Sequence, residues 1–101
     1  MSTIKTTIKL ESDCQVLGVF LHQPGEISPD PLPGVSHTVK RDLEPGPYAV
    51  SASGTGNQPG RKVTVTISTS VNAKTATQLA ENDGSMIGWF PFHIDEQGNV
   101  S

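Results

Sequence analysis

Apolar and polar residues alternate with a period of two along several stretches of the chain. The clearest stretch is 61–70, where valine and isoleucine alternate with lysine, threonine and serine. Residues 4–10 and 48–53 follow the same pattern. Because successive side chains of a β-strand point to opposite faces of the sheet, the alternation predicts strands with one buried and one solvated face.

Three further segments have less simple patterns. Residues 14–22 are apolar on both parities, which predicts a strand that is central or covered on both sides. Residues 35–39 form a weaker strand candidate. Residues 73–80 fit either a strand or a short helix, because their alanines and leucine also follow a helical stripe behind an N-cap candidate, Asn72. Their threonine content and their continuity with the preceding strand favour a strand.

The dipeptide Pro-Gly occurs four times, at 24–25, 33–34, 45–46 and 59–60. Proline presets φ for the second position of a turn, and glycine supplies the positive φ that a type II turn needs at the third. The unequal intervals argue against a repeat architecture and match the turn spacing of a small sandwich or barrel.

Two other connections have their own signals. The sequence Asn82-Asp83-Gly84 predicts a hairpin-type turn into the last strand. The long proline-rich stretch 23–34 predicts a crossover between two sheets.

These patterns together predict an all-β fold. A chain of 101 residues can bury one modest core, so we expect one domain over residues 1–101. The expected architecture is a single antiparallel β-sandwich of about seven strands, of the Ig-like or Greek-key kind.

The segment Leu43-Glu44-Pro45-Gly46-Pro47-Tyr48 resembles a motif of bacterial accessory β-sandwich modules. The motif is the L-x-P-G-x-Y turn and strand of the carboxypeptidase regulatory-like and pre-peptidase C-terminal kinds. Leu43, Pro45, Gly46 and Tyr48 carry the resemblance. It implies a sandwich and specifies no ligand.

Charge narrows the range of partners. The formal net charge is −3, and no basic block is longer than the pairs Lys40-Arg41 and Arg61-Lys62. Nucleic acids and anionic membranes both require clustered Lys and Arg, so we expect neither as a partner.

Two features bear on the cellular compartment. Charges interrupt the N-terminal stretch where a signal peptide needs an apolar run, and no stretch approaches about 18 apolar residues. The single Cys14 can form no internal disulfide, which fits a reducing compartment. We therefore expect a cytoplasmic protein, unless a leader has been removed.

The motifs of known chemistry are absent or incomplete. There is no G-x-S-x-G serine motif and no carboxylate pair in a glycosidase arrangement, so we expect neither an enzyme nor a cofactor. The glycines of 54–60 precede a strand, whereas a nucleotide fingerprint precedes a helix, so this segment is interpreted as a flexible hairpin tip.

Metal binding also lacks a supporting pattern. The three histidines could in principle converge, but their spacing matches no zinc motif: His22, His37 and His93. The carboxylates around the Pro-Gly turns form no calcium loop: Glu26, Asp30, Asp42 and Glu44. We expect no metal site.

The stretch 86–94 differs from the other strands because both of its faces are apolar. Phe90 and Phe92 fall on one parity, and Trp89 falls on the other. Pro91 predicts an edge position or a bulge, since it lacks a donor for the ladder. Either an alternating strand exposes the only Trp of the chain, or a bulge at Pro91 flips the parity and buries it beside the Phe rings.

The sequence therefore supports two function classes. The first is a non-catalytic interaction module that binds a protein partner, or forms a homo-oligomer, through the strand 86–94. The alternative is a small lectin-like domain that stacks Trp89 or Tyr48 on a sugar ring. The candidate contact residues for both classes are Trp89, Ile87, His93 and Tyr48. A row of hydroxyls along 64–70 is interpreted as the solvated side of an amphipathic strand.

Overall fold

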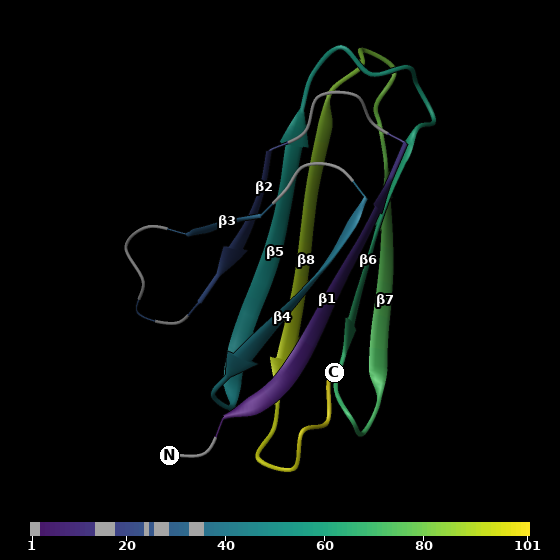
Figure 1. Cartoon of the computed structure of the whole chain (residues 1–101). Helices are drawn as coiled ribbons and strands as arrows, with labels where there is room; N and C mark the ends of the chain where they lie inside the picture. The colour runs from purple at the N-terminus through teal and green to yellow at the C-terminus, as the bar shows by residue number, and fades with distance from the viewer. Residues whose placement is uncertain (1–2, 14–17, 24, 26–28, 33–35) are drawn as a thin grey trace.

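The chain forms two four-stranded antiparallel sheets that face each other as a β-sandwich (Figure 1). This is a computed structural model, and it describes residues 3–13, 18–23, 25, 29–32 and 36–101. The strands are β1 (Ile4–Ser12), β2 (Gly18–His22), β3 (Asp30–Leu32), β4 (His37–Leu43), β5 (Gly46–Gly54), β6 (Lys62–Ser68), β7 (Ala73–Leu79) and β8 (Met86–Ile94). The described residues contain no helix, so the predicted all-β sandwich is confirmed.

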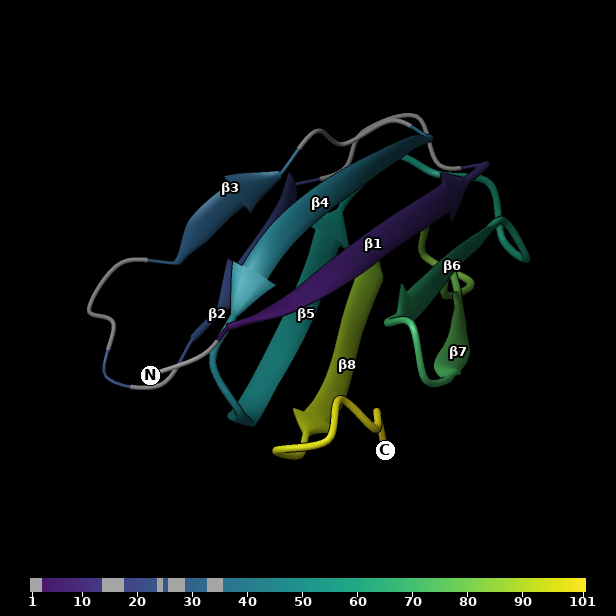
Figure 2. The ribbon, with the colours of Figure 1, turned by 60° about the horizontal axis from the view of Figure 1, so that its bottom comes forward.

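One sheet has the strand order β4-β1-β6-β7, and the other has the order β3-β2-β5-β8. In Figure 2, β1 and β4 pass over β5 and β8, which belong to the second layer. An ion pair at 3.3 Å joins Arg41 of β4 to Asp30 of β3, so it connects an edge strand of one sheet to an edge strand of the other. The molecule is elongated, with principal extents of 44 × 28 × 18 Å.

The core lies between the sheets and uses one parity of each strand. Val63, Val65 and Ile67 of β6 are buried, as the alternation of 61–70 predicts. In β8 every second residue from Met86 to Ile94 is buried. Period-two patterning therefore fixes which face of each strand enters the core.

Several connections differ from their sequence predictions. The stretch 23–34 leads from β2 in one sheet toward β4 in the other, as predicted, but it contains the additional strand β3, which pairs with β2, so the described residues form eight strands. Pro31 is tolerated there because β3 lies at the edge of its sheet. Residues 73–79 form β7, and the helical alternative is wrong because the backbone of this stretch pairs with β6 in a continuous antiparallel ladder from Ala73 to Leu79.

The predicted hairpin-type turn at 82–84 forms, since the Gly84 backbone amide donates to the Glu81 carbonyl at 3.0 Å and the Glu81 amide donates to the Ser85 carbonyl at 2.8 Å. It joins β7 and β8, which belong to different sheets and share no ladder. Residues 54–60 likewise cross from β5 to β6 and form no hairpin tip. The two crossings contact each other, since the Asn57 amide donates to the Gly84 carbonyl at 3.0 Å. Gly84 has φ 84° and could carry no side chain, because a Cβ there would lie 2.7 Å from the Asn57 carbonyl oxygen.

The Pro-Gly turns can be checked only in part. Gly60 has φ 85° and Gly25 has φ 75°, the positive values that a type II turn requires. Gly46 has φ 154° and already pairs with Ile94 in β5, so the type II turn predicted at 45–46 is wrong. Pro24, the pair 33–34 and the first four residues of 14–22 lie outside the described residues.

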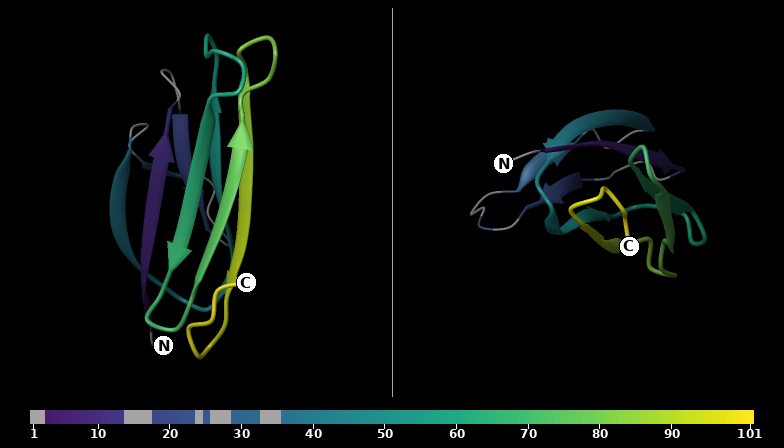
Figure 3. Two further views of the ribbon diagram at one scale, coloured as in Figure 1. Left: turned by 90° about the vertical axis from the view of Figure 1, so that its right-hand side faces the viewer. Right: turned by 90° about the horizontal axis from the view of Figure 1, so that it is seen from below.

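The C-terminal segment folds back beside the end of β8 (Figure 3). Asp95 accepts hydrogen bonds from the amides of Gln97 and Asn99 and closes a turn. Val100 then pairs with Ile94 and is buried in the core. The Asn72 side chain holds Val100 in place, accepting from its amide at 2.7 Å and donating to its carbonyl at 2.9 Å.

Candidate functional site

Strand β8 exposes two large apolar side chains on its outer side. Trp89 is 61% exposed and Ile87 is 74% exposed. The pairing of β8 with β5 is continuous from Gly46↔Ile94 to Gly54↔Met86, so Pro91 introduces no bulge. The alternative in which a bulge buries Trp89 is therefore wrong, and the outward position is confirmed.

Pro91 sits where its missing amide costs no ladder bond. Its carbonyl accepts from Lys74 Nζ of β7 at 2.8 Å, on the side away from β5. The amide and carbonyl of one residue point the same way in an antiparallel strand, so the Pro91 nitrogen faces the sheet edge. Further along, His93 exchanges both of its backbone hydrogen bonds with Ser101. Much of the β8 edge is thus occupied, and its outer face is the more accessible surface.

The outer face of β2, β5 and β8 carries no formal charge. We call it the uncharged face. It consists of Gly18, Phe20, His22, Pro47, Ala49, Ser51, Ser53, Ile87, Trp89, Pro91 and His93. None of these described residues is Asp, Glu, Lys or Arg.

The Trp89 ring leans across β5 toward β2. Its centroid lies 5.0 Å from that of the His22 ring, at an interplanar angle of 51°. His22 Nε2 is hydrogen-bonded to Ser51 Oγ at 2.7 Å, which fixes the imidazole over the middle strand. The two rings cover Ala49, which points outward yet is only 4% exposed. The contact therefore holds Trp89 in a defined position on an open surface.

A shallow hollow of about 250 Å³ lies beside these rings. It is lined by His22, Gln23, Pro47, Tyr48, Ala49, Trp89 and Pro91. The hollow has an aromatic wall, an apolar floor and few polar groups, but it is open, so it could contact one face of a ligand without enclosing it.

Tyr48 does not join this surface as an aromatic platform. Its ring is buried in the core and stacks on Phe92 with centroids 5.4 Å apart. Its hydroxyl donates to the Glu44 carbonyl. Burial, and to a lesser extent the nearby Glu44 charge, raises the pKa of Tyr48. The expectation that Tyr48 stacks on a ligand is corrected, because its inward parity in β5 turns the ring away from solvent.

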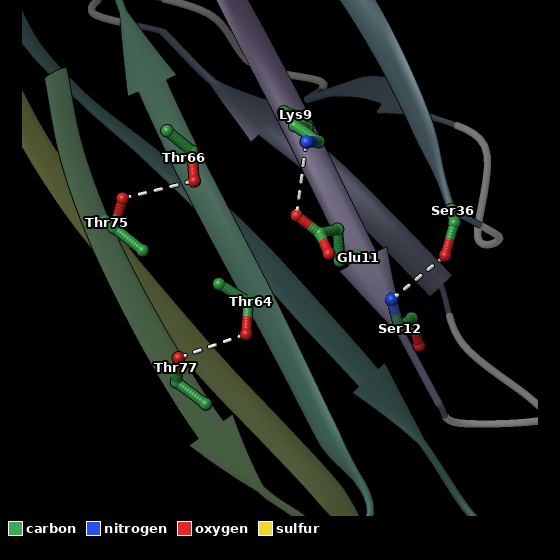
Figure 4. A network of polar contacts seen from close by, with 8 residues as sticks. All are labelled: Lys9, Glu11, Ser12, Ser36, Thr64, Thr66, Thr75 and Thr77. Carbon is green, nitrogen blue, oxygen red and sulfur yellow. Dashed lines mark hydrogen bonds and ion pairs between the residues drawn. The ribbon is translucent and has the colours of Figure 1, made fainter.

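The outer face of the other sheet has the opposite chemistry. We call it the polar face, and it is formed by the outward side chains of β4, β1, β6 and β7. Figure 4 shows its hydrogen bonds: the hydroxyls of Thr64 and Thr77 lie 3.0 Å apart, and those of Thr66 and Thr75 lie 3.1 Å apart. Lysines and carboxylates surround this hydroxyl ladder: Lys5, Lys9, Glu11, Lys40, Asp42 and Lys62.

The remaining candidates do not converge. His22 and His93 lie on the uncharged face, whereas His37 begins β4 in the other sheet. Within the described part of the chain, no three His, Cys, Asp or Glu side chains are grouped as a metal site requires. Cys14 and Glu26 fall outside that part. No helix in the described ranges is long and apolar enough to cross a membrane.

Sequence reasoning found Trp89, Ile87 and His93 on this face but missed Phe20 and His22. The signal for Phe20 was present, because residues 14–22 are apolar on both parities and one parity had to face outward. The contact between His22 and Trp89 depends on strand order, which the sequence does not reveal. No known protein family, curated protein or solved structure matches this chain.

Proposed function

We propose that this protein is a non-catalytic interaction module that binds a protein partner, in the first instance another copy of itself, through the uncharged face. Trp89 and Ile87 are its main contact residues, and His93 lies at the rim. The proposal moves the contact from the edge of β8 to the face that β8 shares with β5 and β2.

One observation supports the proposal above all others, namely the contrast between the two outer faces. The polar face carries lysines, carboxylates and hydroxyls, as a solvated sheet surface does. The uncharged face exposes Trp89, Ile87 and Phe20 together. Contiguous exposed apolar groups on a soluble domain typically mark interaction sites, and charged residues are depleted at interface centres.

The position of Trp89 adds to this argument. Burying an exposed Trp in an interface contributes on the order of 2 kcal/mol or more, as alanine substitutions show. The His22 contact already restricts the Trp89 side chain, so less rotamer entropy remains to be lost on binding. Trp89 is therefore an anchor residue in the proposed interface.

The test is a mass measurement in solution by sedimentation velocity, on the native chain and on two variants. Trp89→Asp places a charge in the uncharged face and should give a folded monomer. Leu79→Asp is the matched control, because Leu79 is 54% exposed on the polar face. It should associate as the native chain does. Equal masses for all three proteins over the whole concentration range would contradict self-association through this face.

A neutral carbohydrate is a second candidate, favoured by the hollow beside Trp89. A sugar ring has an apolar face that can stack on an indole and hydroxyls that could reach Gln23 and His22. Because Trp89 is the only Trp, its fluorescence reports on this hollow alone. Saturable fluorescence changes with soluble oligosaccharides, in a protein that stays monomeric, would support this candidate over the first.

A further inference from the structure

We propose that two copies of this chain meet face to face about a two-fold axis that runs along β5. The proposal rests on the proposed function and adds the identity of the partner and the register of the contact. It concerns the uncharged face only, and it makes Ser53 of each copy face Ser53 of the other.

Charge favours a second copy as the occupant. In a two-fold contact the same patch meets itself, so a charged residue on the axis faces its own like charge. The uncharged face has no Asp, Glu, Lys or Arg to repel its copy or to lose hydration without a counter-ion. Because the face has no charged side chain, a strongly charged partner would find no opposite charge to pair with.

The register of the strands supplies the geometry. Three rows cross the face, each with one residue from β2, one from β5 and one from β8: Gly18, Ser53 and Ile87; Phe20, Ser51 and Trp89; His22, Ala49 and Pro91. Rotation about an axis along β5 exchanges β2 and β8 within each row, so every β8 residue meets the β2 residue of its own row.

The size of the side chains matches this exchange. Ile87, the most exposed large apolar side chain of the described residues, meets Gly18 of the other copy, which has no side chain to obstruct it. A Cβ placed at Gly18 would approach the Phe20 ring no closer than 3.6 Å, an ordinary contact distance. Trp89 meets the partly exposed Phe20, and aromatic pairs of this kind stabilise interfaces.

A two-fold axis across the strands fits less well. It would place Trp89 against itself and Ile87 against Pro91, so bulky groups would meet with no recess on either side. Ser53 of the middle strand is small and exposed, so it leaves room on the axis along β5, while the Trp89 and His22 rings beside it set the distance between the two sheets.

The area of the uncharged face indicates how tightly two copies should bind. β5 and β8 have nine residues each and β2 has five, so the face covers at most roughly 30 by 15 Å, about half of the roughly 800 Å² that each partner buries in a standard interface. A weak dimer is therefore expected, and the measurements should extend from about 10 µM to 1 mM protein.

The experiment uses two variants that are complementary in charge, Ser53→Glu and Ser53→Lys. Ser53 is exposed, and circular dichroism and thermal unfolding check that both variants keep the fold. Each variant alone opposes like charges on the axis, so its dimer dissociation constant should rise by about ten-fold or more relative to the native chain. An equimolar mixture should form a heterodimer of near-native affinity, weakened by about 1 M NaCl. The pair Thr66→Glu and Thr66→Lys on the polar face is the control and should leave the native dimer unchanged.

The outcomes separate this proposal from the proposed function. If Trp89→Asp abolishes dimerisation but the Ser53 variants do not complement each other, the face is the interface and the axis along β5 is wrong. If the native chain remains monomeric up to about 1 mM, a second copy is not the occupant. If Trp89→Asp dimerises as the native chain does, both proposals are overturned.

Discussion

The hydroxyl of Tyr48 donates a hydrogen bond to the backbone carbonyl of Glu44, four residues earlier in the chain. The two residues lie on either side of the turn from β4 in one sheet to β5 in the other. A Tyr in this relation to an upstream carbonyl is the tyrosine corner of β-sandwich domains. It stabilises the point at which the chain changes sheet, which explains in physical terms why Leu43, Pro45, Gly46 and Tyr48 occur together. The resemblance to accessory sandwich modules beyond this turn stays a prediction.

Removing this hydroxyl should destabilise the fold without changing its packing. Tyr48→Phe keeps the stacking on Phe92 but leaves the Glu44 carbonyl without its donor. We expect a loss of about 1 kcal/mol in the free energy of unfolding. Urea denaturation followed by circular dichroism measures it, and the m-value should not change. A stability equal to that of the native chain would show that the corner contributes nothing.

The same residue predicts a limit to stability at alkaline pH. Burial raises the pKa of Tyr48 in the folded protein, so its contribution is fully present below the ordinary tyrosine pKa of about 10. It is lost as pH rises through the raised folded pKa. Because Tyr48 is the only Tyr, the phenolate absorbance reports on this group alone. Glu44→Gln should lower the pKa of Tyr48 by removing the second cause of the shift, and an unchanged titration would contradict that assignment.

Alanine substitutions at two glycines in neighbouring loops distinguish the cost of backbone strain from the cost of a steric clash. Gly84 and Gly56 both have positive φ, at 84° and 75°. A Cβ on Gly56 meets nothing within 4 Å, whereas a Cβ on Gly84 lies 2.7 Å from the Asn57 carbonyl oxygen. Gly56→Ala should cost only about 1 kcal/mol, and Gly84→Ala should cost clearly more. Thermal unfolding of the two variants side by side tests this, and equal losses would show that the loops can move apart.

The turn at Asp95 predicts a local response to acid. Hydrogen bonds from Asn99 and Gln97 lower the pKa of Asp95. Its contribution is therefore present above the ordinary Asp pKa of about 4 and is lost as pH falls through the lower folded pKa. We expect the amides of Asn99 and Ser101 to lose protection from hydrogen exchange at acid pH before the core does. In Asp95→Asn the protection should be weaker and should no longer depend on pH in this range.

The period-two patterns predicted the sandwich because each strand buries every second residue, and this alternation can be recognised within the strand's own sequence. The inward residues of β6 follow directly from the alternation, whereas the exposure of Trp89 in β8 was one of two alternatives that the sequence left open. Strand order depends on contacts between distant segments, which is why the sequence did not reveal that His22 lies beside Trp89. Short edge strands such as β3 also give little signal, since proline and aspartate suit an edge as well as a loop. The sequence therefore predicted the β8 residues of the candidate surface and missed its β2 residues.

Trp89 and Phe90 are neighbours in the chain, yet the structure assigns them to opposite faces of one strand. Phe90 is buried and its ring packs over Gly88, where a Cβ would lie 2.8 Å from the ring. Phe90→Ala should therefore cost about 3–5 kcal/mol of stability through the cavity it leaves. Trp89→Ala should change stability little and should raise the dissociation constant of the proposed dimer.

The free energy of unfolding and the dissociation constant are measured for both variants. Phe90→Ala should change mainly the first quantity, and Trp89→Ala should change mainly the second. If Phe90→Ala does not fold, Phe90→Leu keeps the comparison, with an expected cost of up to about 1.5 kcal/mol. A Trp89→Ala variant that loses as much stability as the Phe90 variant would mean that the indole supports the monomer. The exposed face would then be a structural surface, and its case as a binding site would rest on Ile87 and Phe20 alone.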